Sequence, residues 1–254
     1  HHVTLLEDGD ILFFDNGNLR HKGEKKDCKK EGLWIFYHEN GQIAQQANYL
    51  NGKFEGERKI YNENGSLSEE TSYKENRLDG PYNLYDQEGN ILLAYSFKDG
   101  LREGLYKSFY QNGQLDSTGN YSDNKADGDW KWYHQDGKLR MEGRFKEGKR
   151  EGYFKYYDSD GLSAEGAFKE GKQDGLFKFY FNGALESEVN YKDGKEEGLA
   201  RVYYSNGTIQ EEWIYTDGEY ENHRCWTAKG KKIRCKKLDS YDKLINDIEE
   251  YLDQ

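Results

Sequence analysis

The sequence predicts an all-β protein: an elongated, twisted antiparallel meander of about nine hairpin repeats of 23–24 residues, with a C-terminal capping helix. Three observations support this fold class. Glycine recurs at an almost constant period, an aromatic residue follows five positions later, and each period holds two turn signals. Self-similarity at a fixed period is typical of repeat proteins, in which every unit rests on its neighbours.

The period is measured between glycines that begin each unit, and it is always 23 or 24 residues. These leading glycines are Gly9, Gly32, Gly56, Gly80, Gly104, Gly128, Gly152, Gly175 and Gly198. The aromatic residues that follow the last eight are Tyr37, Tyr61, Tyr85, Phe109, Tyr133, Tyr157, Tyr180 and Tyr203.

Each unit reads as two short strands separated by tight turns. The unit from Gly32 has turns at Asn40-Gly41 and Asn51-Gly52, and the unit from Gly128 has them at Asp136-Gly137 and Glu147-Gly148. Asn-Gly and Asp-Gly favour type I′ hairpin turns, because both central residues need a positive φ. Apolar residues alternate within the strands, so one face of the sheet is expected to collect them.

Three segments follow from this pattern. Residues 1–8 combine His1-His2, which resembles the end of a purification tag, with an N-terminal lead-in. Residues 9–235 form the repeat array, and residues 236–254 predict an amphipathic helix that Asp239 can cap. Two roles stay open for that helix: a lid on the last strand, or an element that binds a partner. The missing initiator Met leaves the bacterial cytoplasm and, after removal of a leader, the periplasm or cell surface as locations.

The composition restricts the partners. The net charge of −11 disfavours nucleic acid and anionic lipid, and no apolar run approaches the roughly 20 residues of a membrane-spanning helix. The 22 Tyr, 12 Phe and 5 Trp residues can supply a thin core although only 34% of the residues are hydrophobic. A monomer that binds a cationic protein fits this balance.

No catalytic, cofactor or metal site is expected. His38 and His134 occupy the same place in units 96 residues apart, so they cannot share a metal ion or a proton. Carboxylates precede the leading glycines: Glu55, Asp79, Glu103, Asp127, Glu151, Asp174 and Glu197. A group that recurs once per unit indicates a turn role, whereas acid–base catalysis needs one or two carboxylates in distinct environments.

Cys225 and Cys235 lie at equal distances on either side of Gly230, in the last hairpin. A cross-strand disulfide requires Cα atoms within roughly 7 Å, and two free thiols in a reducing compartment are the alternative. If Cys225 and Cys235 are bonded, Cys28 is left as the odd, free cysteine.

Candidate partner-binding residues come from two groups. Tyr110, Tyr157, Phe181 and Tyr204 each stand beside another aromatic residue that cannot face the same way, so they are expected to be exposed; half-burial on both faces is the alternative. Exposed Tyr and Phe anchors dominate interface energies. The carboxylates Glu103, Asp127 and Glu151 would line one edge and attract a cationic partner.

The motif Gly-x-aromatic-x-x-Tyr, then Asn-Gly, an aliphatic residue, Tyr or Phe, and Gly-Lys-x-x-Gly resembles the MORN-variant repeat, most clearly at 128–149 and 175–195. Over residues 9–235 the chain also resembles bacterial YwqK-family antitoxins. The resemblance implies a non-enzymatic protein that neutralises a toxin by binding it, as an antitoxin or immunity protein. A bacterial surface or periplasmic module that contacts host or envelope components is the alternative.

Overall fold

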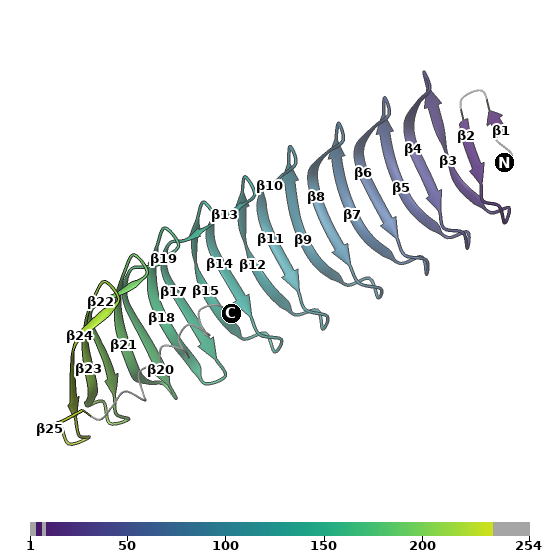
Figure 1. Cartoon of the computed structure of the whole chain (residues 1–254). Helices are drawn as coiled ribbons and strands as arrows, with labels where there is room; N and C mark the ends of the chain where they lie inside the picture. The colour runs from purple at the N-terminus through teal and green to yellow at the C-terminus, as the bar shows by residue number, and fades with distance from the viewer. Residues whose placement is uncertain (1–3, 7–8, 236–254) are drawn as a thin grey trace. The chain divides into compact units, whose positions relative to one another are not determined.

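A computed structural model of the chain describes residues 4–6 and 9–235, and every regular element in this part is a β-strand (Figure 1). The chain divides into two compact units, residues 1–157 and residues 158–254. The expected all-β antiparallel class is therefore confirmed for the described residues. The predicted helix within 236–254 lies outside them.

The first unit is an open meander in which each strand pairs antiparallel with its neighbours in the sequence. Its strands are β1 (Thr4–Leu6), β2 (Gly9–Phe13), β3 (Leu19–Lys26), β4 (Lys29–Tyr37), β5 (Ile43–Leu50), β6 (Lys53–Tyr61), β7 (Leu67–Lys74), β8 (Arg77–Tyr85), β9 (Ile91–Lys98), β10 (Leu101–Arg102), β11 (Gly104–Phe109), β12 (Leu115–Ser122), β13 (Lys125–Ala126), β14 (Gly128–Tyr133), β15 (Leu139–Lys146), β16 (Lys149–Arg150) and β17 (Gly152–Asp158).

The second unit repeats the same antiparallel order. Its strands are β18 (Gly161–Lys169), β19 (Lys172–Gln173), β20 (Gly175–Phe181), β21 (Ala184–Lys192), β22 (Lys195–Tyr203), β23 (Ile209–Thr216), β24 (Glu219–Trp226) and β25 (Lys232–Ile233). Within each unit, Figure 1 shows the strands side by side in chain order.

The turns at the two ends of the strands differ. At one end, two-residue turns such as Asn51-Gly52 have positive φ at both residues (52° and 81°), as the expected type I′ turn requires. At the other end, most turns have a positive φ at the glycine alone, as at Gly41 (85°), where His38 N–H donates to the Gln42 carbonyl at 2.8 Å. Asn182-Gly183 is an exception, with a positive φ at both residues (49° and 75°). The type I′ expectation is wrong for Asn40-Gly41, because the strand register shifts between Phe36 and Tyr37 and the loop is longer.

Aromatic side chains build the core along one side of each sheet, here called the aromatic face. Alternation along β14 places Trp130 and Trp132 on this side, and their rings stack with centroids 5.7 Å apart. Across the sheet, Trp130 also packs against Tyr106, Tyr121 and Phe145. Such offset and edge-on ring pairs add stabilisation beyond the burial of apolar area.

A second glycine set makes room for these rings. A Cβ built on Gly23, Gly119, Gly143 or Gly166 would lie 2.1–2.3 Å from the ring of the residue eleven positions later. Those rings belong to Trp34, Trp130, Phe154 and Phe177, all of which are buried. The Trp130 indole N–H also donates to the Asn120 carbonyl (3.2 Å), beside Gly119. Each ring therefore lies directly on the backbone of the preceding strand, where only glycine leaves space.

Candidate functional site

The side of each sheet opposite the aromatic face carries a central row of paired and mostly polar or charged residues, here called the polar row; Ile35 and Ala94 interrupt it in the first unit. In the first unit it includes Lys59, Glu70, Lys107, Lys131, Glu142 and Lys155. In the second unit it comprises Glu165, Lys178, Glu188, Arg201, Glu212 and Arg224. The first unit mixes charged and neutral members, whereas acid and base alternate at every step of the second.

Ion pairs fix part of the polar row in the second unit. The Arg201 guanidinium lies 3.1 Å from Glu188 and 3.0 Å from Glu212, and Arg224 lies 3.2 Å from Glu212. Glu212 is buried, and two arginines compensate its charge. Because cross-strand neighbours hold these side chains, the row presents charges in set positions, as specific recognition of another surface requires.

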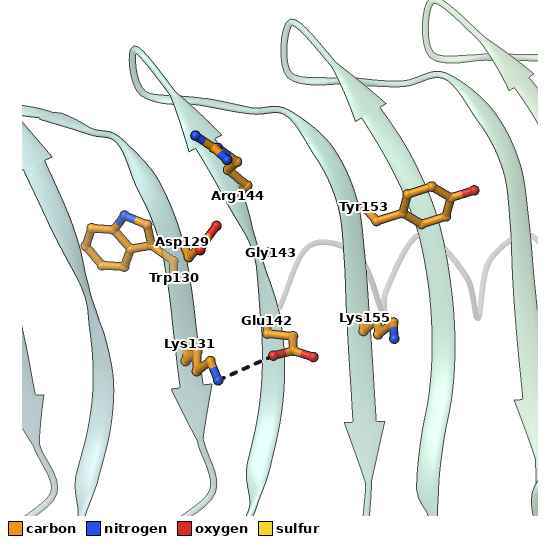
Figure 2. A pocket seen from close by; sticks show the side chains of 8 residues that line it. All are labelled: Asp129, Trp130, Lys131, Glu142, Gly143, Arg144, Tyr153 and Lys155. Carbon is orange, nitrogen blue, oxygen red and sulfur yellow. Dashed lines mark ion pairs between the residues drawn. The ribbon is translucent and has the colours of Figure 1, made fainter.

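The first unit holds a shallow depression of about 340 Å³ across β14, β15 and β17. Its lining residues are Asp129, Trp130, Lys131, Glu142, Gly143, Arg144, Tyr153 and Lys155 (Figure 2). Lys131 Nζ and Glu142 Oε2 form an ion pair 3.7 Å apart, which the dashed line in Figure 2 marks.

The chemistry of this depression suits a protein surface. Three cationic side chains, Lys131, Arg144 and Lys155, outnumber the two carboxylates that line it. The Tyr153 ring is 66% exposed and offers a rigid apolar plate with a polar tip. A partner residue can therefore pair its charge and cover an aromatic ring at the same place, although the whole chain is acidic.

The structure corrects the expected exposure of three candidate aromatics. Tyr110 and Tyr204 are half-buried and donate to the carbonyls of Tyr133 (2.6 Å) and Trp226 (2.8 Å), so they tie consecutive hairpins together. Tyr157 is half-buried, and its hydroxyl donates to Glu142 (3.1 Å). Phe181 is the one of the four that stands exposed, at 65%. The expected contribution of all four to binding stays a prediction.

The carboxylates that precede the leading glycines have a turn role where their contacts are given. Glu103 Oε2 accepts the Asp123 N–H at 3.1 Å, and Asp127 Oδ1 accepts the Glu147 N–H at 3.4 Å. The same bond, spanning twenty residues, recurs at Glu31, Glu55, Asp79 and Glu197. Glu151 occupies the same position in its own unit, and its backbone N–H donates to the Arg144 carbonyl (2.8 Å). These carboxylates therefore serve the turns of the following hairpin, whatever they contribute to a partner.

Of the two states considered for Cys225 and Cys235, disulfide or free thiols, the structure has the disulfide. Cys225 and Cys235 form a disulfide between Cα atoms 5.3 Å apart, and Cys28 is a free, exposed thiol. The Sγ atoms lie beside the His223 imidazole, whose Nε2 is 3.3 Å from Cys225. Sequence reasoning missed this histidine, although the spacing His223-x-Cys225 places both side chains on one side of a strand.

Tyrosine hydroxyls on the polar side are buried against carboxylates, which affects their pKa. Burial and the adjacent Glu165 carboxylate, which accepts the Tyr180 hydroxyl at 2.9 Å, raise the pKa of Tyr180 to about 12. Burial and Glu188 likewise raise the pKa of Tyr203 to about 12. Both values exceed the ordinary pKa of 10.0, so the fold favours the neutral phenols.

We therefore expect stability to fall in alkali. The stabilisation from these phenols is complete below pH 10, where they are neutral in both states, and is lost as the pH rises toward 12. Thermal melting followed across this range should decline less steeply in the Tyr180→Phe/Tyr203→Phe variant than in the parent chain. Tyr153→Phe, which removes the hydroxyl of an exposed ring, is the matched control. An equal decline in the parent and the double variant would contradict the expectation.

The fold and its surfaces define a repeat protein in which antiparallel hairpins of one design pack on their neighbours. The family described as MORN repeat variant matches residues 30–51, 54–75, 102–123, 126–147, 173–193 and 196–217, which together exceed half of the chain. The chain belongs to this family. The repeat and the β-meander indicate a repeat scaffold. Among the curated proteins, none matches this chain.

Solved structures with some likeness have low identities. A porin-like protein from Bacteroides uniformis is 11% identical, with 84% of this chain and 92% of that one covered and a TM-score of 0.20. A chain of the TcdB2-TccC3-Cdc42 structure is 11% identical over 89% of this chain and 15% of its own, with a TM-score of 0.21. A chain of the Photorhabdus luminescens Tc holotoxin pore is 12% identical over 88% and 14%, with a TM-score of 0.18. TM-scores this low carry no argument about fold or function.

Within the described residues, no helical segment has the length and apolar character needed to cross a bilayer.

Proposed function

We propose that this chain is a non-enzymatic, protein-binding scaffold of the antitoxin or immunity type, which neutralises a toxin domain by covering it. The polar row is the observation that supports the proposal most directly. It sets charged side chains at regular cross-strand positions on the face away from the aromatic core. Side chains held on strands lose little freedom on binding, which lowers the entropic cost of association.

The sequence supports the choice of partner. The six MORN-variant matches support a repeat protein, and the period of the leading glycines continues through the unmatched stretches. The proposed antitoxin role rests on the resemblance of this sequence pattern to the YwqK antitoxins. The net charge of −11 favours a cationic toxin domain, whose approach the summed negative field would accelerate. The depression at Arg144 and Tyr153 then gives local contacts for an acidic or apolar side chain of that partner.

One observation favours a second function, a periplasmic or surface module that contacts host or envelope components. Disulfides persist in oxidising compartments, and Cys225 and Cys235 are bonded. An immunity protein in the periplasm would satisfy the same observation, so the partner rather than the compartment distinguishes the two functions.

The test is association kinetics with the protein encoded next to this one, at low and moderate salt. We expect the association rate constant to fall steeply with salt while dissociation changes little. The variant Glu103→Gln/Asp127→Asn/Glu151→Gln removes three charges but keeps an acceptor oxygen for the turns, and should slow association roughly tenfold at low salt.

The control places the same charge change in the opposite turns of earlier hairpins, between β4 and β9. Glu39, Glu63 and Glu88 are exposed residues of the opposite turns, so their triple change to Gln alters the net charge equally. A slower association in the first variant alone assigns the partner to the carboxylate edge. Equal slowing in both would refute that edge, and a tight complex without salt dependence would refute the electrostatic steering. Binding to glycans or cells, with no complex with the neighbouring protein, would replace the antitoxin role by the surface role.

A further inference from the structure

A cluster of metal-ligating side chains lies at the end of the described chain, on β23, β24 and the residues after β25. The His223 imidazole, the Cys225 sulfur and the Cys235 sulfur lie within 4.8 Å of one another. Glu211 adds a fourth group, because its Oε2 lies 3.1 Å from His223 Nε2. Nothing in the expected binding function uses these four side chains.

The sheet register brings them together. His223 and Cys225 are two residues apart on β24 and share one side of the strand. Cys225 is directly opposite Glu211 on β23 and opposite Ile233 on β25, two residues before Cys235. Trp213 stacks on the His223 ring with centroids 4.8 Å apart and an angle of 9°, which holds the imidazole in its plane.

We propose that, once the disulfide is reduced, Cys225, Cys235 and His223 bind one Zn²⁺ ion, with Glu211 or water as the fourth ligand. Thiolate and imidazole are the ligand set that zinc prefers. In a tetrahedral site with bonds of about 2.0–2.3 Å, ligand atoms lie roughly 3.3–3.8 Å apart. The contacts from His223 Nε2 to Cys225 Sγ (3.3 Å) and Glu211 Oε2 (3.1 Å) are already close to this spacing.

The chemistry needs a reductant and balances as two steps. A dithiol transfers two electrons and two protons to the Cys225–Cys235 bond, becomes a disulfide itself and leaves two thiols. Zn²⁺ then displaces the two thiol protons and binds both thiolates together with the neutral imidazole. The Cα separation of 5.3 Å leaves the sulfur atoms free to part by side-chain rotation alone. The last hairpin would thus be closed by a covalent bond under oxidising conditions and by a metal under reducing ones.

The experiment titrates the full chain with Co²⁺, a coloured substitute for Zn²⁺, after reduction with a phosphine and removal of excess reductant. We expect one equivalent to bind, with thiolate-to-cobalt charge-transfer absorption, and Zn²⁺ to displace it. The oxidised protein has the same sequence and should bind no cobalt at this site, so it controls for weak surface carboxylates.

Variants assign the ligands. Cys225→Ser, Cys235→Ser and His223→Ala should each weaken binding at least about 100-fold, and Glu211→Gln should weaken it less. Cys28→Ser removes the free thiol of the other unit and is the matched control, expected to bind as the parent does. Native mass spectrometry counts the bound ion in each protein, and circular dichroism shows whether each variant is folded.

Three outcomes overturn the proposal: a reduced protein that binds no cobalt, an oxidised protein that binds it equally, or loss of the absorption in Cys28→Ser.

Discussion

Replacing Gly166 with Val is expected to lower the free energy of unfolding by about 3 kcal/mol, the upper part of the range for overpacking a core. A Cβ at this position would lie 2.3 Å from the Phe177 ring, and that ring is fully buried. Phe168 and Tyr191 pack against it in T-shaped pairs with ring centroids 5.3 Å away, so a shift of the ring would disturb both neighbours. Denaturant unfolding followed by circular dichroism measures the loss.

A second substitution that should restore stability to Gly166→Val is suggested by the equivalent pair of residues in the next hairpin. One hairpin further along, Val189 lies opposite Ala200, so a larger residue stands where the glycine would be and a smaller one replaces the ring. Gly166→Val combined with Phe177→Ala should therefore be more stable than the sum of the two single changes predicts. Phe177→Ala alone is the control and should cost about 3–5 kcal/mol, because it leaves a cavity. Additive losses would show that the ring does not rest on Gly166.

Replacing Trp130 and Trp132 together with Ala is expected to cost at least about 4 kcal/mol in the first unit. Trp130 is buried, packs against Tyr121 and Phe145 on the two flanking strands, and donates its N–H to the Asn120 carbonyl. Because repeat units are stabilised by their nearest neighbours, the damage should be local. Amide hydrogen exchange should accelerate most in β11–β15 and remain slow in β4 and β22.

The matched control is the exposed aromatic Tyr153→Ala, which should leave exchange in β11–β15 close to that of the parent. If protection in β4 and β22 collapses as far as in β14, the unfolding is globally cooperative and the nearest-neighbour description fails.

The sequence predicts the strands well because their signals are local. A positive φ is demanded at each tight turn, and glycine, Asn and Asp meet it, so Asn51-Gly52 can be read directly as a hairpin. The type of the opposite turn could not be read in this way. Its form depends on a register shift between Phe36 and Tyr37, which arises from pairing across strands and leaves no mark in the dipeptide Asn40-Gly41.

The candidate site was harder to predict than the fold. Two adjacent aromatics point to opposite sides of a regular strand, so Tyr110 and Tyr204 were expected at the surface. Both lie just after a register shift, where their hydroxyls reach the carbonyl of a residue 22–23 positions later. The polar row did leave a signal, since Lys or Arg returns three residues after most leading glycines, as at Lys131, Lys155 and Arg201. These basic residues form a row of paired charges only because the strand register places Glu142, Glu188 and Glu212 opposite them, and the sequence alone does not give that register.

The packing of rings on glycines gives the array a direction. In the hairpin β14–β15, Trp130 covers Gly119 of the preceding hairpin, and Gly143 receives Phe154 of the following one. The two flanks of one hairpin are therefore chemically unlike: one projects an aromatic ring and the other offers a bare backbone surface. A fragment cut on both sides of this hairpin would expose the Trp130 ring at its N-terminal edge and the bare backbone at Gly143, which fits a ring, at its C-terminal edge. Two such fragments would therefore associate in one orientation, with the ring edge of one against the glycine edge of the other.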